Sequence, residues 1–197
     1  MKKIINISVF VMTTIWLLGC ASTRGPELPA NQLIDGTYIN IHSPNSNGWF
    51  KQVHSDSQVV FAKYGSKSGE SYIARVVFFP LEATNTKEEF LELIINHETR
   101  GRNKERFTIM ESDFKSFEQR SYSCVIAKQL SKDKKAKTSP FSNEELLMQV
   151  KSLFCKDPKR EKAGFMVGYS FRGYSINGNF DEEADSFIEG VQFPNIK

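Results

Sequence analysis

Four β-strand candidates follow one another in the second half of the chain, and this run limits the possible folds more than any other feature. They occupy residues 106–118, 121–130, 145–156 and 164–174. In the last segment Phe165, Val167, Tyr169 and Phe171 alternate with other residues, which is the pattern of a strand with one buried face. Because no helix pattern interrupts the run, we expect an antiparallel meander.

Two cysteines lie in the second and third of these strands. A hairpin register that sets Cys124 opposite Cys155 also sets apolar residues opposite apolar residues along both segments. The same register pairs Lys128 with Lys151, which is mildly unfavourable. A thiol nucleophile or a metal-binding pair would use the same residues, but the register favours a structural role. We predict a Cys124–Cys155 disulfide that contributes roughly 3–4 kcal/mol.

The first half of the chain contains shorter strand candidates at 37–41, 49–54, 58–64 and 71–80. The stretch "SYIARVVFFP" at 71–80 is an almost unbroken run of apolar and β-branched residues. Such runs are typical of central strands that are covered on both faces. We therefore expect 71–80 to lie inside the sheet.

Two segments have the period of a helix. In 86–100 the apolar residues Phe90, Leu93 and Ile94 share one face, and Thr86 with Glu89 has the spacing of a capping box. The last segment, "FDEEADSFIEGVQF" at 180–193, begins with three acidic residues, which suit the positive end of a helix dipole. We predict a helix in each segment.

Together these elements predict an α+β fold, an antiparallel β-sheet meander packed with helices. A strand ending "FRG", the segment "FDEEADSFIEGVQF" and the earlier "GWFK" and "SYIARV" resemble a group of uncharacterised bacterial outer-membrane-type lipoproteins. Their domain is similar to the PsbP-like α/β/α sandwich. The resemblance covers roughly 37–193 and implies this fold and a role in binding or organising other proteins. It implies no catalytic residue.

The N-terminal segment predicts the cellular location of the chain. Lys2 and Lys3 precede an apolar stretch that ends in Leu17-Leu18-Gly19-Cys20, which resembles the lipobox of bacterial lipoproteins. We therefore expect a signal peptide at 1–19, a diacylated Cys20 with a flexible tether over 20–36, and one globular domain over 37–197. An ordinary cleaved signal and a short anchor helix are the alternatives. The absence of Asp at position 21 favours the outer membrane, facing the periplasm.

Charge and cysteine content agree with this predicted location. The whole chain carries 26 basic and 23 acidic residues, and removal of Lys2 and Lys3 leaves it almost neutral. This balance gives no reason to expect nucleic acid as a partner. An even number of cysteines besides Cys20 suits an oxidising compartment.

Residues with catalytic or metal-binding potential are few. The three histidines, His42, His54 and His97, form no closely spaced ligand pair, and there is no Cys-x-x-Cys motif. No Gly-x-Ser-x-Gly motif occurs, and "YGSKSGE" at 64–70 lacks the spacing of a phosphate-binding loop. We therefore expect no metal, no cofactor and no enzymatic activity, although paired acids of a glycosidase would not be distinguishable by sequence.

Basic residues are concentrated in three loops, at 100–106, 128–137 and 156–162. In the predicted meander the first two loops share one end of the sheet and the third lies at the other. Solvation alone accounts for such loops in many proteins. We hypothesise that the shared end forms an interaction surface for an acidic protein face or anionic lipid. It would comprise Arg100, Arg102, Lys104, Arg106, Lys132, Lys134, Lys135 and Lys137.

The functional hypothesis from the sequence is a non-catalytic cell-envelope lipoprotein. It would be held to the membrane by its lipid anchor and would present its domain to an envelope protein partner or to envelope assembly. The alternatives are an immunity or exclusion lipoprotein that neutralises a toxin, and a small-ligand carrier or hydrolase.

Overall fold

A computed structural model describes residues 25–35, 38, 40–136 and 145–192. Along the chain the elements are β1 (Leu33–Ile34), β2 (Asn40–His42), β3 (Phe50–Ser55), β4 (Gln58–Tyr64), β5 (Ser71–Pro80), α1 (Lys87–Arg100), β6 (Phe107–Ser116), β7 (Cys124–Asp133), β8 (Leu146–Lys156), β9 (Ala163–Gly173), α2 (Phe180–Glu189) and β10 (Val191–Gln192).

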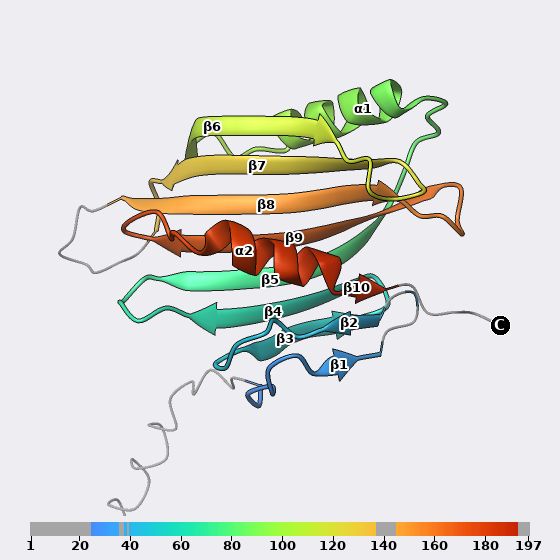
Figure 1. Cartoon of the computed structure of the whole chain (residues 1–197). Helices are drawn as coiled ribbons and strands as arrows, with labels where there is room; N and C mark the ends of the chain where they lie inside the picture. The colour runs from blue at the N-terminus through green and yellow to red at the C-terminus, as the bar shows by residue number, and fades with distance from the viewer. Residues whose placement is uncertain (1–24, 36–37, 39, 137–144, 193–197) are drawn as a thin grey trace, which may run out of the picture.

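Seven strands form one antiparallel sheet in the order β3-β4-β5-β9-β8-β7-β6 (Figure 1). The four strands of the second half form the predicted meander, and Cys124 lies opposite Cys155 in the register expected from the sequence. The strands β1, β2 and β10 form a separate small sheet. The predicted α+β class is confirmed.

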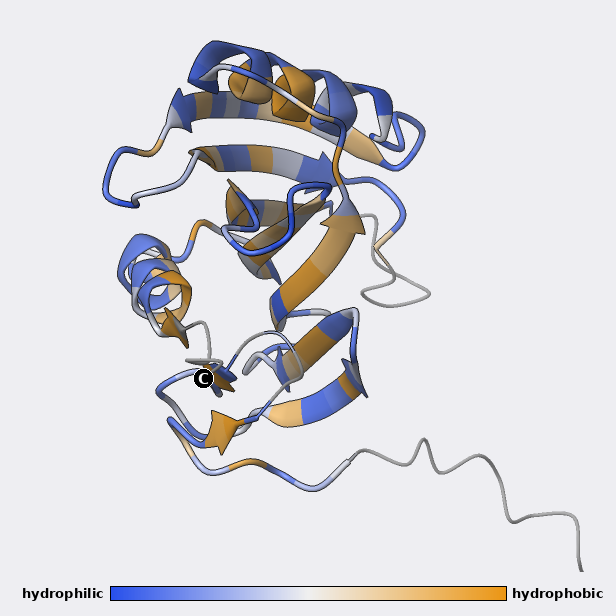
Figure 2. Cartoon of the chain, turned by 90° about the vertical axis from the view of Figure 1, so that its right-hand side faces the viewer, coloured by the Kyte–Doolittle hydropathy of each residue, from blue (hydrophilic) through white to orange (hydrophobic). Residues whose placement is uncertain are grey.

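The two helices lie on opposite faces of the large sheet (Figures 1 and 2). On one face Phe90 and Ile94 of α1 pack against Val125, Phe154 and other apolar residues of the sheet. On the other face α2 and the small sheet cover a larger aromatic core. That core includes Trp49, Phe61, Phe165, Tyr169, Phe171, Phe180 and Phe187. The clean alternation in 164–174 thus turns one row of β9 side chains toward α2.

Helix α1 begins where the sequence predicts. The side chain of Thr86 accepts a hydrogen bond from the amide of Glu89 at 3.1 Å. The carboxylate of Glu89 accepts a hydrogen bond from the amide of Asn85, one residue before the cap, at 2.7 Å. Gly101 closes the helix by donating its amide to the carbonyl of His97. In a standard capping box Glu89 would accept from the amide of the cap residue Thr86. Here it accepts from the amide of the preceding residue, Asn85.

Helix α2 is shorter than the predicted 180–193. It ends at Glu189, and the amide of Gly190 donates to the carbonyl of Ser186. Val191 then pairs with Ile41 in the small sheet, so the last part of the segment predicted as helix lies in a strand. The cause is local, because glycine after the last turn favours an end to the helix.

The strand β5 is not covered on both faces as predicted. Ala74 and Val76 are buried against the α2-side core, but Arg75 on the opposite face is exposed and Val77 is half-buried. Helix α1 packs mainly on β6 and β7, so Val77 and Phe79 of β5 are only partly buried beside its apolar side chains. An apolar run does not reveal which half of a sheet a helix will cover.

The predicted tether over 20–36 is attached to the domain along most of its described part. Glu27 forms an isolated β-bridge with Phe50, and the amide of Leu28 donates to the carbonyl of Trp49 at 2.7 Å. The hydroxyl of Ser43 donates to the carbonyl of Pro29 at 2.7 Å. Leu28 is buried, which composition alone did not indicate because it stands among Pro, Gly and polar residues.

Candidate functional site

The helices cover diagonally opposite halves of the large sheet. Helix α1 packs on β6 and β7 from one side, and α2 packs on β8 and β9 from the other. Consequently most of the α2-side face of β6 and β7 carries no covering helix within the described residues (Figure 2), and Cys124 and Ile126 at one end of β7 join the aromatic core. This uncovered area lies beside the N-terminal turn of α2.

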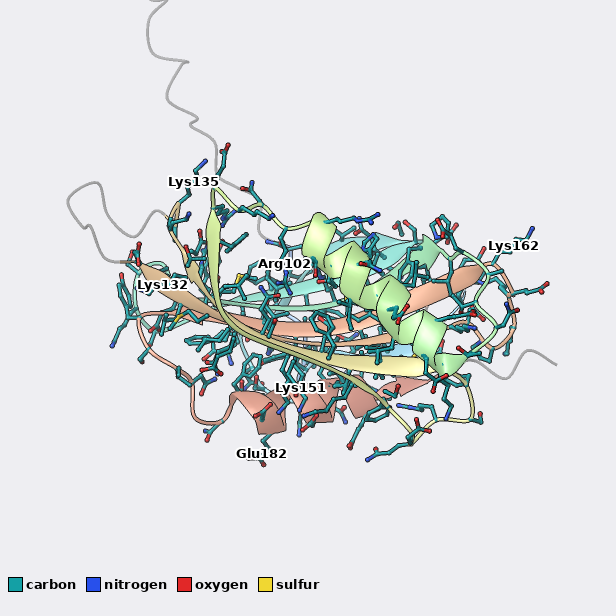
Figure 3. All side chains as sticks on the ribbon, turned by 90° about the horizontal axis from the view of Figure 1, so that it is seen from above. Arg102, Lys132, Lys135, Lys151, Lys162 and Glu182 are labelled. Atoms are coloured by element: carbon teal, nitrogen blue, oxygen red, sulfur yellow. A yellow bond between two sulfur atoms is a disulfide. The ribbon has the colours of Figure 1, made fainter. Side chains whose placement is uncertain are left out.

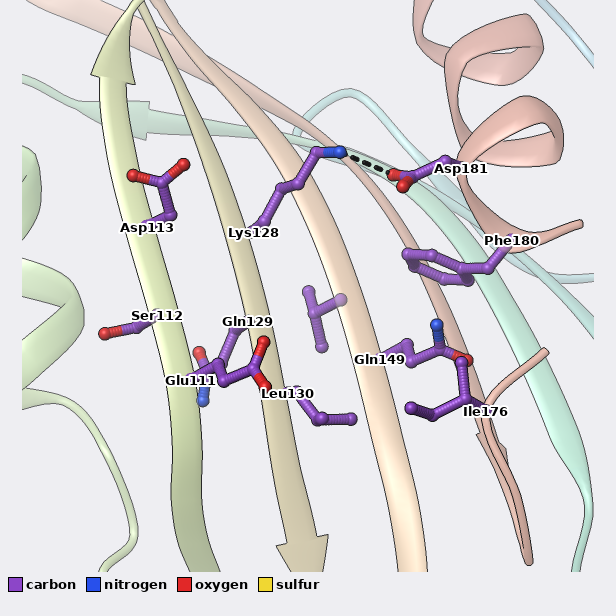
Figure 4. Close-up of a pocket in the computed structure, with 11 residues that line it drawn as sticks. Glu111, Ser112, Asp113, Lys128, Gln129, Leu130, Gln149, Ile176, Phe180 and Asp181 are labelled. Atoms are coloured by element: carbon purple, nitrogen blue, oxygen red, sulfur yellow. Dashed lines mark ion pairs between the residues drawn. The ribbon is translucent and has the colours of Figure 1, made fainter. Parts of the chain in front are cut away.

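A groove of about 570 Å³ occupies this area (Figure 4). We name it the β6–β8 groove. Glu111 and Asp113 of β6 form one wall, and the other wall is built by α2 and the loop before it. The floor lies over β7 and β8. Its lining residues are Glu111, Ser112, Asp113, Lys128, Gln129, Leu130, Gln149, Val150, Ile176, Phe180 and Asp181.

The floor and far wall of the groove are partly apolar. Leu130 is half-buried, and Phe180 belongs to the aromatic core but also lines the groove. Ile176 is 57% exposed, which is high for an aliphatic side chain. The amide of Asn177 donates to the side-chain oxygen of Gln149 at 2.7 Å and so holds the loop that carries Ile176 against β8.

An ion-pair network closes one end of the groove. Lys128 and Lys151 lie opposite each other on β7 and β8, and Asp181 accepts from both, at 2.8 and 3.3 Å. Asp185, one turn further along α2, contacts Lys151 at 2.6 Å. The unfavourable lysine pair expected from the sequence is thus compensated by the acidic start of the last helix.

The network favours the charged forms of Asp181 and Lys128. The hydrogen bond from Lys128 lowers the pKa of Asp181 below its ordinary value, and Lys151 adds to this effect. The same hydrogen bond raises the pKa of Lys128, although burial opposes the change. Near the network, burial and the carboxylate of Glu183 raise the pKa of Tyr169, whose hydroxyl donates to that carboxylate at 3.0 Å. Helix α2 is therefore positioned by polar contacts as well as by apolar packing.

The acids on the β6 wall are less engaged. Asp113 pairs with Lys115 on its own strand at 2.6 Å, and both side chains are exposed. Glu111 lies opposite Leu130 in the strand register and extends over β7 in Figure 4. Its carboxylate makes no ion pair with any residue that the structure describes. Glu111 is thus an accessible negative charge beside apolar atoms.

A second pocket, of about 470 Å³, lies on the opposite face between α1 and the strands β5, β8 and β9. Val77, Phe79, Ile94 and Met166 make it largely apolar. Arg75 stands at its side. Although the residue as a whole is exposed, protein atoms crowd its guanidinium and the resulting desolvation lowers its pKa, while the charge of Glu98 opposes that shift. This pocket follows from the incomplete cover that α1 gives to the sheet.

The structure brings the first two of the three predicted basic loops together at one end of the sheet. Phe107 at the start of β6 pairs with Asp133 at the end of β7, so the loops next to them are neighbours. Arg102, Lys132 and Lys135 lie at this end in Figure 3, and Lys162 of the third loop lies at the other. Lys137 lies outside the described residues.

Several of these bases already have acidic partners. Arg106 forms two hydrogen bonds with the buried carboxylate of Asp133, at 2.9 and 2.7 Å. Burial would raise the pKa of Asp133, but Arg106 and further contacts lower it overall. Lys132 pairs with Glu145, and Lys135 pairs with Glu105. Much of the positive charge at this end is therefore neutralised locally, and its role as an interaction surface stays a prediction.

The remaining candidates have structural roles or are not described. A disulfide joins Cys124 to Cys155. Cys20 lies outside the described residues. His97 contacts the carboxylate of Glu98 at 3.8 Å.

Within the described ranges no three His, Cys, Asp or Glu side chains are arranged to hold a metal ion. In the same ranges, no helix has the length and apolar character needed to cross a membrane.

The groove residues were not among the sequence-predicted sites. Glu111, Leu130 and Ile176 belong to no motif. Glu111 and Leu130 are partners in the β6–β7 register, and Ile176 joins them from the loop before α2. One signal was present in the sequence, since the expected Lys128–Lys151 pair required acidic neighbours from another element. The acids of "FDEEAD" were assigned to the helix dipole alone, but two of them pair with these lysines.

Comparisons with known proteins identify no family for the chain. No protein-family model matches the sequence, and no curated protein matches it either. Among solved structures, the Ran-binding protein Mog1p of Saccharomyces cerevisiae matches with a TM-score of 0.42 and 12% identity, over 83% of this chain and 96% of that one. A point mutant of Mog1 matches with a TM-score of 0.41 and the same identity and coverage.

These matches correct the functional prediction. The sequence led us to expect a non-catalytic envelope lipoprotein, with immunity protein, small-ligand carrier and hydrolase as alternatives. The similar structures are of a Ran-binding protein and not of an envelope lipoprotein, so the predicted function is wrong on this comparison, while acylation of Cys20 and the envelope location stay predictions. At this TM-score and identity, no residue role and no partner of Mog1p is transferred to the chain.

Proposed function

We propose that this chain is a protein-binding module and that the β6–β8 groove is its binding surface. The observation that supports this most directly is the uncovered half-face of the sheet, where exposed Ile176 and half-buried Leu130 lie beside charged side chains. Apolar contact area framed by polar groups is the usual composition of a protein interface.

The shape of the groove supports a polypeptide rather than a small molecule. Small-molecule sites are concave and enclose most of the ligand surface, whereas this groove is open along the face of the sheet (Figure 4). Its outer wall is β6, which is the last strand in the sheet order of the described elements. An extended segment can therefore enter the groove across β6 and lie over β7 and β8.

Photocrosslinking tests this proposal. A photoreactive amino acid at Ile176 is expected to form one discrete protein adduct in the cells that produce the chain. Leu33 is the control site, because it is similarly exposed (47% against 57%) and lies near the opposite edge of the sheet (Figure 1). The second substitution Leu130→Glu should abolish the adduct at Ile176, and Leu33→Glu should not. Equal labelling at both sites, or an adduct insensitive to Leu130→Glu, would contradict the proposal.

Two further proposals concern the type of fold and the cellular location of the chain. The layer order of α1, sheet and α2 supports assignment to the PsbP-like α/β/α sandwich, as does the resemblance of 37–193. The lipobox-like residues that end at Cys20 support acylation of that cysteine and attachment to the outer membrane, facing the periplasm. Neither of these proposals identifies a binding partner.

A further inference from the structure

We infer that the β6–β8 groove recognises an extended segment that carries a lysine or arginine two residues from a large aliphatic side chain. This inference rests on the proposed protein-binding function and adds the chemistry of the partner. It depends on two properties of the groove, the balance of its charges and the position of Glu111 opposite Leu130 in the strand register.

The charge balance favours a cation. Both lysines of the groove region are engaged by α2, Lys128 by Asp181 and Lys151 by Asp181 and Asp185. An incoming carboxylate or phosphate would have to compete with these contacts. Glu111 has no ion pair within the described residues, so an incoming cation meets a free carboxylate. Charge complementarity of this kind gives specificity to an interface.

The arrangement of Glu111 and the apolar residues favours an extended segment. In a strand, side chains two residues apart point to the same side and are about 6.5–7 Å apart. Glu111 lies opposite Leu130 in the strand register, so a segment that places a cation at Glu111 can place the side chain two residues away in the apolar area between Leu130 and Ile176. The intervening side chain points to solvent and can vary.

Labelled peptides test the inference directly with the full-length protein. Three probes share one backbone sequence and differ in the pair of key residues, Lys-x-Leu, Glu-x-Leu and Lys-x-Ser. Fluorescence anisotropy should give the tightest binding for Lys-x-Leu, with each single change weakening it by about threefold or more. Binding should also weaken between about 50 mM and about 500 mM salt, because the charges lie at the surface.

A charge reversal at Glu111 distinguishes peptide binding in the groove from an effect of the protein's net charge. Glu111→Lys should weaken binding of Lys-x-Leu by about tenfold, since an attraction becomes a repulsion. Glu161→Lys is the matched control, because it changes the net charge equally in the exposed β8–β9 loop, near Lys162 at one end of the sheet (Figure 3). That variant should alter binding less than about twofold. Circular dichroism checks that both variants are folded.

The outcomes separate this inference from the proposed function. If Glu-x-Leu binds as well as Lys-x-Leu, if none of the probes binds, or if Glu111→Lys has no larger effect than Glu161→Lys, the inferred partner chemistry is wrong. The crosslink at Ile176 would still support the groove as a protein-binding surface in each of these cases. If the crosslink is absent, the proposed function fails, whichever peptide binds.

Discussion

Removal of the Lys151 side chain should cost less stability than removal of the two acids that contact it. Lys151 lies in the middle of β8, and its side chain is only 6% exposed. The carboxylates of Asp181 and Asp185 are 61% and 52% exposed. The lysine therefore depends on these acids far more than they depend on the lysine, because water can solvate the acids but not the lysine.

The magnitudes follow from the distances. At 2.6 and 3.3 Å, each ion pair of Lys151 contributes about 5–6 kcal/mol at an effective dielectric constant of about 20, before the cost of desolvation. Exposure of the acids and burial of the lysine remove most of this gain. We expect Lys151→Met to lower the free energy of unfolding by about 1–2 kcal/mol, since both acids remain hydrated.

Removal of both acids instead leaves the buried ammonium group of Lys151 without an acidic partner. Asp181→Asn with Asp185→Asn should lower the free energy of unfolding by about 3 kcal/mol or more, because Lys151 then faces Lys128 with no acid between them. Addition of Lys151→Met to this pair should recover part of the lost stability and leave the triple variant within about 2 kcal/mol of the original chain. Urea denaturation followed by circular dichroism measures all three variants.

The order of these losses is the test. An exposed control pair is available on β6, where Lys115 and Asp113 are 70% and 53% exposed. Lys115→Met should cost less than about 0.5 kcal/mol. If Lys151→Met costs more than the double Asp variant, or if the triple variant is less stable than the double, the asymmetry argued from burial is refuted.

Three further predictions concern other parts of the chain. Cys124→Ala with Cys155→Ala should leave a folded protein whose free energy of unfolding falls by roughly 3–4 kcal/mol, and an unchanged urea midpoint would contradict this. The pKa values of Asp133 and Asp181 are lowered in the fold, so the unfolded chain takes up protons at higher pH. Their contribution to stability should be complete above about pH 5 and should decrease as the pH falls through about 4 and below. Asp133→Asn should therefore flatten the dependence of unfolding free energy on pH in that range, and an unaltered slope would count against it. Cys20→Ser should abolish labelling by fatty acid and release the protein from the membrane, and retention of both would refute acylation of that residue.

The sequence predicted the meander because its signals are local and repeated. The alternation of apolar residues from Phe165 to Phe171 in β9 specifies faces, and the opposing cysteines of β7 and β8 specify register. The small sheet escaped prediction because its strands have two or three residues, which is too short for a period. The end of α2 could have been predicted from Gly190, whose position after the last apolar turn is typical of a helix terminus.

The groove could not be predicted because it depends on which half of the sheet each helix covers. The same apolar stripe on α2 would serve a helix lying over β6 and β7 instead of β8 and β9. The positions of Asp181 and Asp185 opposite Lys128 and Lys151 favour the observed placement, but they become recognisable only once the strand register is known.

Methyl NMR of the full-length protein tests the central claim most directly. The Lys-x-Leu peptide is added to protein labelled at its Ile and Leu methyl groups. We predict that the signals of Leu130 and Ile176 in the β6–β8 groove shift on titration, and that those of Leu93 and Ile94 in the second pocket do not. Shifts at Leu93 and Ile94, with unchanged signals at Leu130 and Ile176, would place the binding surface on the opposite face and contradict the account.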